Sequence, residues 1–173
     1  MLKHAASCLS DRSGLAAVEF ALIAPVMVIM FFGTVELSSA IDCNSRVARV
    51  SSTVSDLVAQ SPAVSSADTA NIFNAANAIL FPYAAANAKI VVTSLVANSS
   101  GVVTVDWSDA QNTSKRTSPP ANIPAGVLPA STSVIYAEVT YSFTPAISYF
   151  LGTINLTGKF YSKPRRAVKV THS

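Results

Sequence analysis

The sequence predicts an α+β fold in which a long N-terminal helix, transmembrane in its first half and amphipathic in its second, packs on a small antiparallel sheet. Residues 15–35 form an apolar run in which only Glu19 is charged, and a helix of about 21 residues spans roughly 30 Å, the thickness of the hydrocarbon core of a bilayer. Apolar residues then recur at spacings of four and three as far as Leu57, which is the period of one helix face. Segments that alternate apolar and polar residues follow, and these are typical of strands.

The long helix is expected to run from about Leu15 to about Ala59 and to end before Pro62, because the residue preceding a proline avoids helical angles. Its second half carries an apolar stripe that we expect to pack in the core, with polar residues on the other faces. The stripe contains Cys43, Val47, Val50, Val54 and Leu57, and the polar residues are Asp42, Asn44, Arg46, Arg49 and Ser51.

Residues 61–173 are expected to form one α+β domain, since they are numerous enough to bury a core without metals or a dense disulfide framework. Ser65 and Asp68 have the spacing of a capping box and predict a helix over 67–81. The pattern then predicts a linker (84–88), a hairpin of two strands (89–97 and 101–108), a proline-rich loop (109–133), a strand (131–144), a turn or short helix (145–152) and a last strand (153–162). We expect the loop to be a variable surface segment, with contact to a partner as the alternative.

Composition limits the classes of function. Half of the residues are hydrophobic and the mean hydropathy is +0.42, which is high for a soluble domain and is partly due to the predicted span. The net charge is +3, and much of the excess lies in the last fifteen residues. We expect these to form a solvated tail, with acidic lipid headgroups or a partner protein as the alternative contact. No aromatic-basic pattern or known module accompanies them, so nucleic-acid binding is not expected. The basic residues are Lys159, Lys163, Arg165, Arg166 and Lys169.

The two cysteines, Cys8 and Cys43, do not indicate a disulfide scaffold. The segment before Cys8 has no apolar signal core, so this cysteine is not a convincing lipidation site. Cys43 is expected to pack as a small apolar residue on its helix, and a disulfide between two chains is the alternative.

Glu19 is the one charged residue in the predicted span. An ionisable side chain there costs up to about 2.5–3.5 kcal/mol at mid-bilayer, so it is a functional candidate, although near one end it could simply reach the interface. Gly14 ends a short polar leader, Glu19 lies five residues after it and is followed directly by Phe20, and Pro25 lies five residues after Phe20. This spacing resembles the prepilin-peptidase site of type IV pilins, and it is most similar to the TadE-like pseudopilins of tight-adherence (Flp-type) pilus systems.

The resemblance covers about the first third of the chain closely and implies a pilin-like fold and a role as a minor pseudopilin. It implies that residues 1–14 are a prepilin leader and that a prepilin peptidase cuts between Gly14 and Leu15. It also implies that Glu19, together with Phe20, acts in assembly and register, and that Pro25 allows the helix to loosen. The implied partners are the peptidase, other pilins or pseudopilins, the pilus assembly platform and the inner membrane, in surface adhesion by bacteria. Major pilin is disfavoured because Flp-type major subunits are much shorter.

Charge predicts the orientation of the span. Lys3 and Arg12 lie on the short N-terminal side, and basic residues tend to stay cytoplasmic. Arg46 and Arg49 lie on the other side and reduce the difference in positive charge between the two sides of the span. The expected topology is a single-pass bacterial inner-membrane protein with a cytoplasmic N-terminus and an exported C-terminal domain.

The sequence gives no support to an enzyme. His4 and His172 lie at opposite ends of the chain, without partners at metal-ligand or triad spacing. There is no nucleophile-elbow, phosphate-loop or CxxC motif, and Asp106 and Asp109 are expected to be solvated. We therefore expect no cofactor, metal or small-molecule substrate. Two alternatives remain: an unprocessed, membrane-anchored envelope protein that binds a periplasmic partner, and an exported enzyme with an unrecognised site.

Overall fold

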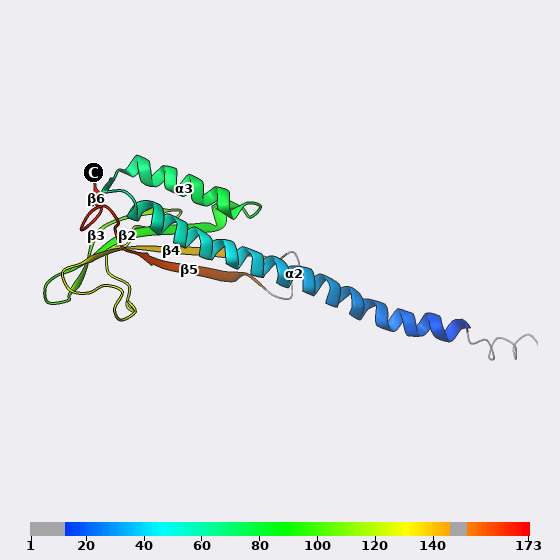
Figure 1. Ribbon diagram of the computed structural model, residues 1–173. Helices are drawn as coiled ribbons and strands as arrows, with labels where there is room; N and C mark the ends of the chain where they lie inside the picture. The colour runs from blue at the N-terminus through cyan, green and yellow to red at the C-terminus, as the bar shows by residue number, and fades with distance from the viewer. Residues whose placement is uncertain (1–12, 146–151) are drawn as a thin grey trace, which may run out of the picture. The chain divides into compact units, whose positions relative to one another are not determined.

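The structure, a computed structural model, describes residues 13–145 and 152–173. The chain divides into two compact units, Met1–Ser39 and Ala40–Ser173. The boundary falls within helix α2 (Ser13–Ala59), which Figure 1 shows running from blue to cyan. A long apolar helix together with an antiparallel sheet gives the predicted α+β fold, so this prediction is confirmed.

In the first unit, helix α2 has no core to pack on. Large apolar side chains are exposed along its whole described length, for example Phe20 (69%), Ile29 (69%) and Phe31 (65%). Thr34 and Ser39 donate their hydroxyl hydrogens to backbone carbonyls four residues earlier, which satisfies these polar groups within the helix. The surface that remains is almost wholly apolar.

In the second unit, residues 40–59 of α2 carry the predicted stripe into a core. The buried side chains are spaced by four, three, four and four residues, and the last is Val58, whereas the predicted Leu57 is only partly buried. Ser51 was expected on a polar face but is 1% exposed, because this side of the helix lies against a strand. The fully buried residues of the stripe are Cys43, Val47, Val50, Val54 and Val58.

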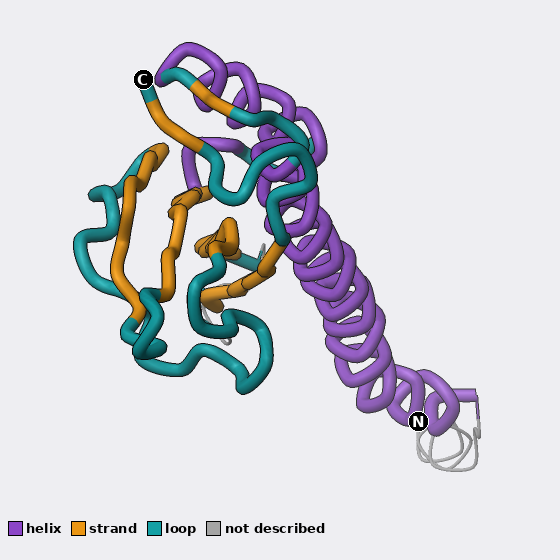
Figure 2. Tube along the Cα trace, turned by 60° about the vertical axis from the view of Figure 1, so that its left-hand side comes forward, coloured by secondary structure: helices purple, strands orange, loops and turns teal. Residues whose placement is uncertain are grey.

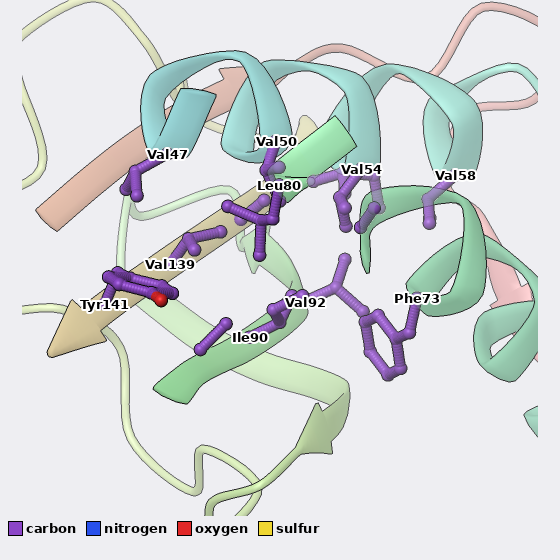
Figure 3. Packing of buried hydrophobic residues seen from close by; sticks show 14 of the residues in the cluster. Val47, Val50, Val54, Val58, Phe73, Leu80, Ile90, Val92, Val139 and Tyr141 are labelled. Carbon is purple, nitrogen blue, oxygen red and sulfur yellow. The ribbon is translucent and has the colours of Figure 1, made fainter. Parts of the chain in front are cut away.

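A four-stranded antiparallel sheet completes this unit, in the order β3-β2-β4-β5. Its strands are β2 (Ala88–Ala97), β3 (Val103–Gln111), β4 (Ser133–Phe143) and β5 (Ile154–Ser162). Figure 2 shows the helices on one side of the sheet, and the inner face of β4 buries every second residue against them, as the alternation predicts. Figure 3 shows side chains of both helices and of β2 and β4 meeting in this core.

Helix α3 (Ser66–Leu80) packs on the same core through Phe73, Ala76 and Leu80. It begins with the predicted capping box: the Ser65 hydroxyl accepts a hydrogen bond from the backbone N–H of Asp68, and the Asp68 carboxylate accepts one from the backbone N–H of Ser65. The Ser65 hydroxyl also donates to the Asp68 carboxylate, and this bond, together with the one from the Ser65 backbone N–H, holds the pKa of Asp68 below its ordinary value. The predicted linker contains the short 3-10 helix η1 (Ala85–Asn87).

Arg46 of α2 caps the other end of α3. Its guanidinium donates to the backbone carbonyls of Ile79 (3.2 Å) and Phe81 (2.6 Å), which have no helical partner at a C-terminus. It also donates to Asp42 at 2.8 Å, and this bond lowers the pKa of the Asp42 carboxyl. A cation from one helix therefore stabilises the end of the other.

The predicted loop 109–133 is shorter at its start, because β3 continues to Gln111. Three of its apolar residues, Ile123, Val127 and Leu128, pack on the outer face of the sheet in a second cluster built on Leu95, Val134 and Tyr136. The loop is therefore a cover for this face as well as a surface segment. The predicted turn or short helix at 145–152 lies largely outside the described residues.

The basic C-terminal segment is not a free solvated tail. Its end forms strand β6 (Thr171–His172), which pairs in parallel with β1 (Ala63–Val64). The indole N–H of Trp107 donates to the Val170 carbonyl at 2.8 Å, and Val170 is fully buried. The cations still point outward, where Arg165 pairs with Asp56 and Lys169 with Asp106. The cations are exposed as predicted, but the prediction of a free tail was wrong because it did not consider Val170, the buried apolar residue that follows the last of them.

Candidate functional site

The candidate site predicted from the sequence lies at the start of helix α2. Gly14 is the second residue of that helix, and a Cβ added there would have no neighbour within 4 Å among the residues that the structure describes. Neither packing nor a positive φ angle requires glycine at this position. The lack of a side chain at Gly14 therefore suits contact with another molecule, because another protein can approach this backbone closely.

Leu15 and Glu19 lie one helical turn apart. Residues four positions apart on a helix are neighbours on one face, and both side chains are exposed in the first unit. Phe20 is next to Glu19 and is also exposed. The carboxylate therefore stands on an apolar helix surface, one turn beyond the bond between Gly14 and Leu15.

Pro25 lies inside α2 without ending it. Proline lacks an amide hydrogen, so the carbonyl of Ala21 has no backbone donor at the usual helical position. Membrane helices tolerate such a defect, and it provides a point at which the helix can bend or loosen. The structure thus places Gly14, Leu15, Glu19, Phe20 and Pro25 on one helix, with Leu15 and Glu19 brought together.

Helix α2 is long and apolar enough to cross a membrane. Its most apolar 18-residue window has a mean hydropathy of 2.4, and none of that window is buried against the rest of the chain. A buried core helix would hide such a face, whereas this one leaves it open to lipid or to other helices. Among the described residues it is the one helix with these properties, which indicates a single-pass membrane anchor.

Comparison with family models matches residues 14–56 to TadE-like proteins. The N-terminal segment is therefore similar to TadE-like proteins. The match begins at the glycine of the motif and continues through the apolar span into the stripe that packs on the sheet. It indicates a role in assembly of the tight-adherence pilus, in association with other pilus assembly components. Comparison with curated proteins and with solved structures finds no match.

Cys43 lies within the TadE-like segment and is fully buried in the core of the second unit. Burial raises the pKa of its thiol to about 11, and the neighbouring Asp42 contributes to the shift. A buried, protonated thiol is a poor nucleophile. Of the two alternatives for this cysteine, the structure favours packing over a disulfide between chains.

A second group of polar side chains was missed by the sequence analysis. Asp109 was expected to be solvated but is only 5% exposed, on the inner face of β3. Its carboxylate accepts hydrogen bonds from Thr69 of α3 (2.8 Å) and Lys115 of the loop (2.7 Å), and His172 of β6 lies 2.7 Å from it. Thr69 and His172 are far from Asp109 in sequence, so no local spacing could have revealed the group.

The Asp109 group has the character of a structural clamp. Burial alone would raise the pKa of the carboxyl, but the contacts with Lys115, Thr69 and His172 outweigh it and hold the pKa below its ordinary value. The Thr69 hydroxyl donates its hydrogen to the Asp109 carboxylate. It is therefore not arranged as a nucleophile that passes a proton to the His172 imidazole, as a catalytic triad would require. Asp109 thus joins α3, the loop and the C-terminal strand to one point.

No group of three or more His, Cys, Asp or Glu side chains that could hold a metal occurs in residues 13–145 or 152–173. The lack of enzymatic activity remains a prediction from the sequence.

Proposed function

We propose that this protein is a minor pseudopilin that a prepilin peptidase cuts between Gly14 and Leu15, and that it takes part in biogenesis of a tight-adherence pilus for surface adhesion. One observation carries the proposal: a glycine with no packing role precedes, by five positions, the carboxylate on an otherwise apolar stretch of exposed helix. The TadE-like match at residues 14–56 supports it.

The chemistry of the cut explains why Glu19 is needed. Hydrolysis of the Gly14–Leu15 peptide bond creates an α-ammonium group on Leu15. Among packed apolar helices an unpaired ammonium is strongly unfavourable, and so is an unpaired carboxylate. Before assembly, Glu19 of the same chain pairs with this ammonium from one helical turn away. Within a filament, Glu19 of a neighbouring subunit pairs with it instead. Because a helix shifted in register would leave both charges unpaired, the pair sets the register.

In this proposal the precursor lies in the bacterial inner membrane with its N-terminus in the cytoplasm. Lys3 and Arg12 hold the leader on the cytoplasmic side, and the domain formed by residues after the span is exported. The peptidase then meets the cut site at the cytoplasmic face. Other pilins or pseudopilins and the assembly platform bind the exposed apolar helix.

Processing is tested with Gly14→Ala, using Gly33→Ala as the matched control. Both glycines lie in the exposed part of α2, and at either position an added Cβ meets no atom of residues 13–145 or 152–173 within 4 Å. Neither substitution should disturb the fold. We expect Gly14→Ala to accumulate as the uncut precursor and Gly33→Ala to be cut normally, as read by the mass of the protein from membrane fractions. Equal cutting of both variants would overturn the proposed site.

Assembly is tested with Glu19→Ala and with Glu19→Asp, which keeps the charge on a side chain one methylene shorter. We expect Glu19→Ala to be inserted and cut but absent from the sheared pilus fraction and from complexes with other pilus components, and Glu19→Asp to retain part of this incorporation. Wild-type incorporation of Glu19→Ala would refute the pairing role. A wild-type protein that keeps its leader would instead favour the unprocessed envelope protein as the alternative.

A further inference from the structure

A polar groove of about 470 Å³ lies on the outer face of the sheet, the face opposite the helices. Its floor is formed by Lys89 and Val91 of β2 and by Glu138 and Thr140 of β4. Its wall is the start of the loop, residues 113–118. The volume falls within the range of about 300–1,000 Å³ that small-ligand sites occupy.

The groove is rich in cations and hydroxyl groups. Lys89, Lys115 and Arg116 line it, against the single carboxylate of Glu138. Lys89 forms no ion pair with any residue in the described ranges, so its ammonium is available. Five hydroxyl side chains stand beside these charges, each able both to donate and to accept a hydrogen bond. They are Thr113, Ser114, Thr117, Ser118 and Thr140.

The floor of the groove is held in place by contacts with neighbouring residues of the same face. Arg116 pairs with Glu138 and lies over the Tyr136 ring, with 5.5 Å between the guanidinium carbon and the ring centroid. Lys159 lies 3.6 Å from the same carboxylate, and Tyr136 is almost fully buried. Glu138 is therefore oriented by two cations and still has acceptor capacity for a hydroxyl donor. A preformed arrangement loses little entropy when a ligand binds.

We propose that this groove binds an acidic carbohydrate, with its carboxylate at Lys89 and its hydroxyl groups between Glu138 and the hydroxyl side chains. The mixture of groups favours this class. A bare anion would use Lys89 but meet the Glu138 carboxylate, whereas a neutral sugar would leave the Lys89 ammonium unused. An acidic sugar satisfies the cation, the carboxylate acceptor and the hydroxyls together. Binding in this groove does not depend on processing at Gly14.

The test measures binding of the purified full-length chain in detergent by calorimetry. The probes are an oligomer of galacturonic acid, a neutral oligomer of galactose and inorganic phosphate. We expect binding of the acidic oligomer alone, weakened by added salt because its carboxylates contact cations. Lys89→Gln should weaken it about tenfold, as for the loss of one charge-assisted hydrogen bond. Thr140→Val should weaken it less.

Lys163→Gln is the matched control, since it removes the same charge from the C-terminal segment, outside the groove. It should bind the acidic oligomer as the wild type does. Three results would overturn the proposal: no binding of the acidic oligomer, equal binding of the neutral oligomer or of phosphate, and equal weakening by Lys163→Gln and Lys89→Gln. Circular dichroism of each variant excludes unfolding as the cause.

Discussion

Gly158 of β5 lies where the sheet comes very close to helix α2. A Cβ added there would lie 2.8 Å from the Val47 backbone oxygen, 3.1 Å from the Val47 carbonyl carbon and 2.9 Å from the Ser51 hydroxyl oxygen. Real Cβ atoms essentially never come this close to another atom. Because Val47 contributes backbone, which cannot rotate away, Gly158→Ala requires the strand and the helix to separate by several tenths of an ångström.

The cost follows from two opposing terms. Overpacking of a dense core costs about 1–3 kcal/mol, and replacing glycine with alanine returns about 0.4–1 kcal/mol by restricting the unfolded chain. We therefore expect Gly158→Ala to lower the free energy of unfolding by about 1–2 kcal/mol, or the Tm by about 3–8 °C for a unit of this size. Chemical and thermal denaturation of the full-length chain, followed by circular dichroism, measures both.

Two variants isolate the cause. Thr157→Ala changes the neighbouring residue of β5, which is exposed on the outer face, and should have little effect. Ser51→Ala combined with Gly158→Ala removes the hydroxyl but leaves the Val47 carbonyl at 2.8 Å, so it should restore only part of the stability. A Gly158→Ala protein as stable as the wild type would refute the close approach of β5 to α2.

Three further predictions concern the second unit. Ser65→Ala removes the capping box of α3 and should lower the free energy of unfolding in urea by about 1 kcal/mol. Asp109→Asn removes a charged acceptor shared by three segments and should cost about 2 kcal/mol. The pKa of Asp109 is lowered in the folded state, so its contribution to the free energy of unfolding is fully present above the ordinary pKa of 3.8 and is lost as the pH falls through the folded-state pKa. Stability measured as a function of acid pH should show this loss in the wild type and not in Asp109→Asn. Cys43 should react with a thiol reagent at neutral pH only after denaturation, as followed by mass spectrometry, because it is buried and its pKa is raised to about 11.

The elements that the sequence predicted well are those determined by local patterns. Helix α2 ends at Ala59, ahead of the Ser61–Pro62 step, and α3 begins at its capping box. Strand β4 alternates between a helix-facing side and an outer side, so its period identifies the residues that pack against the helices. In each case the deciding contacts lie within a few residues of one another.

The parts that were missed depend on contacts between distant residues. Asp109 is buried because Thr69 and His172 meet it from other elements, and no spacing along the chain encodes that meeting. Strands β1 and β6 have two residues each, too few for a period to be visible. The apolar residues of the 112–132 loop are scattered among prolines, which predicts an exposed loop although Ile123 and Leu128 pack on the sheet.

The candidate site at the start of α2 was predictable from the sequence in part. Gly14 and Glu19 form a short motif, so the sequence alone could indicate them. The structure adds that Gly14 has no packing role and that Leu15 and Glu19 lie one turn apart on an exposed apolar helix. The outer-face groove could not be predicted, because Lys89 and Glu138 are joined only by the pairing of β2 with β4.

The mature N-terminus of the protein recovered from bacterial membranes tests the central claim most directly. Intact mass and N-terminal sequencing of the same sample should give a chain that begins at Leu15, with its new ammonium one turn from Glu19. A chain that begins at Met1 would contradict the proposed cut and, with it, the charge pair that the cut creates.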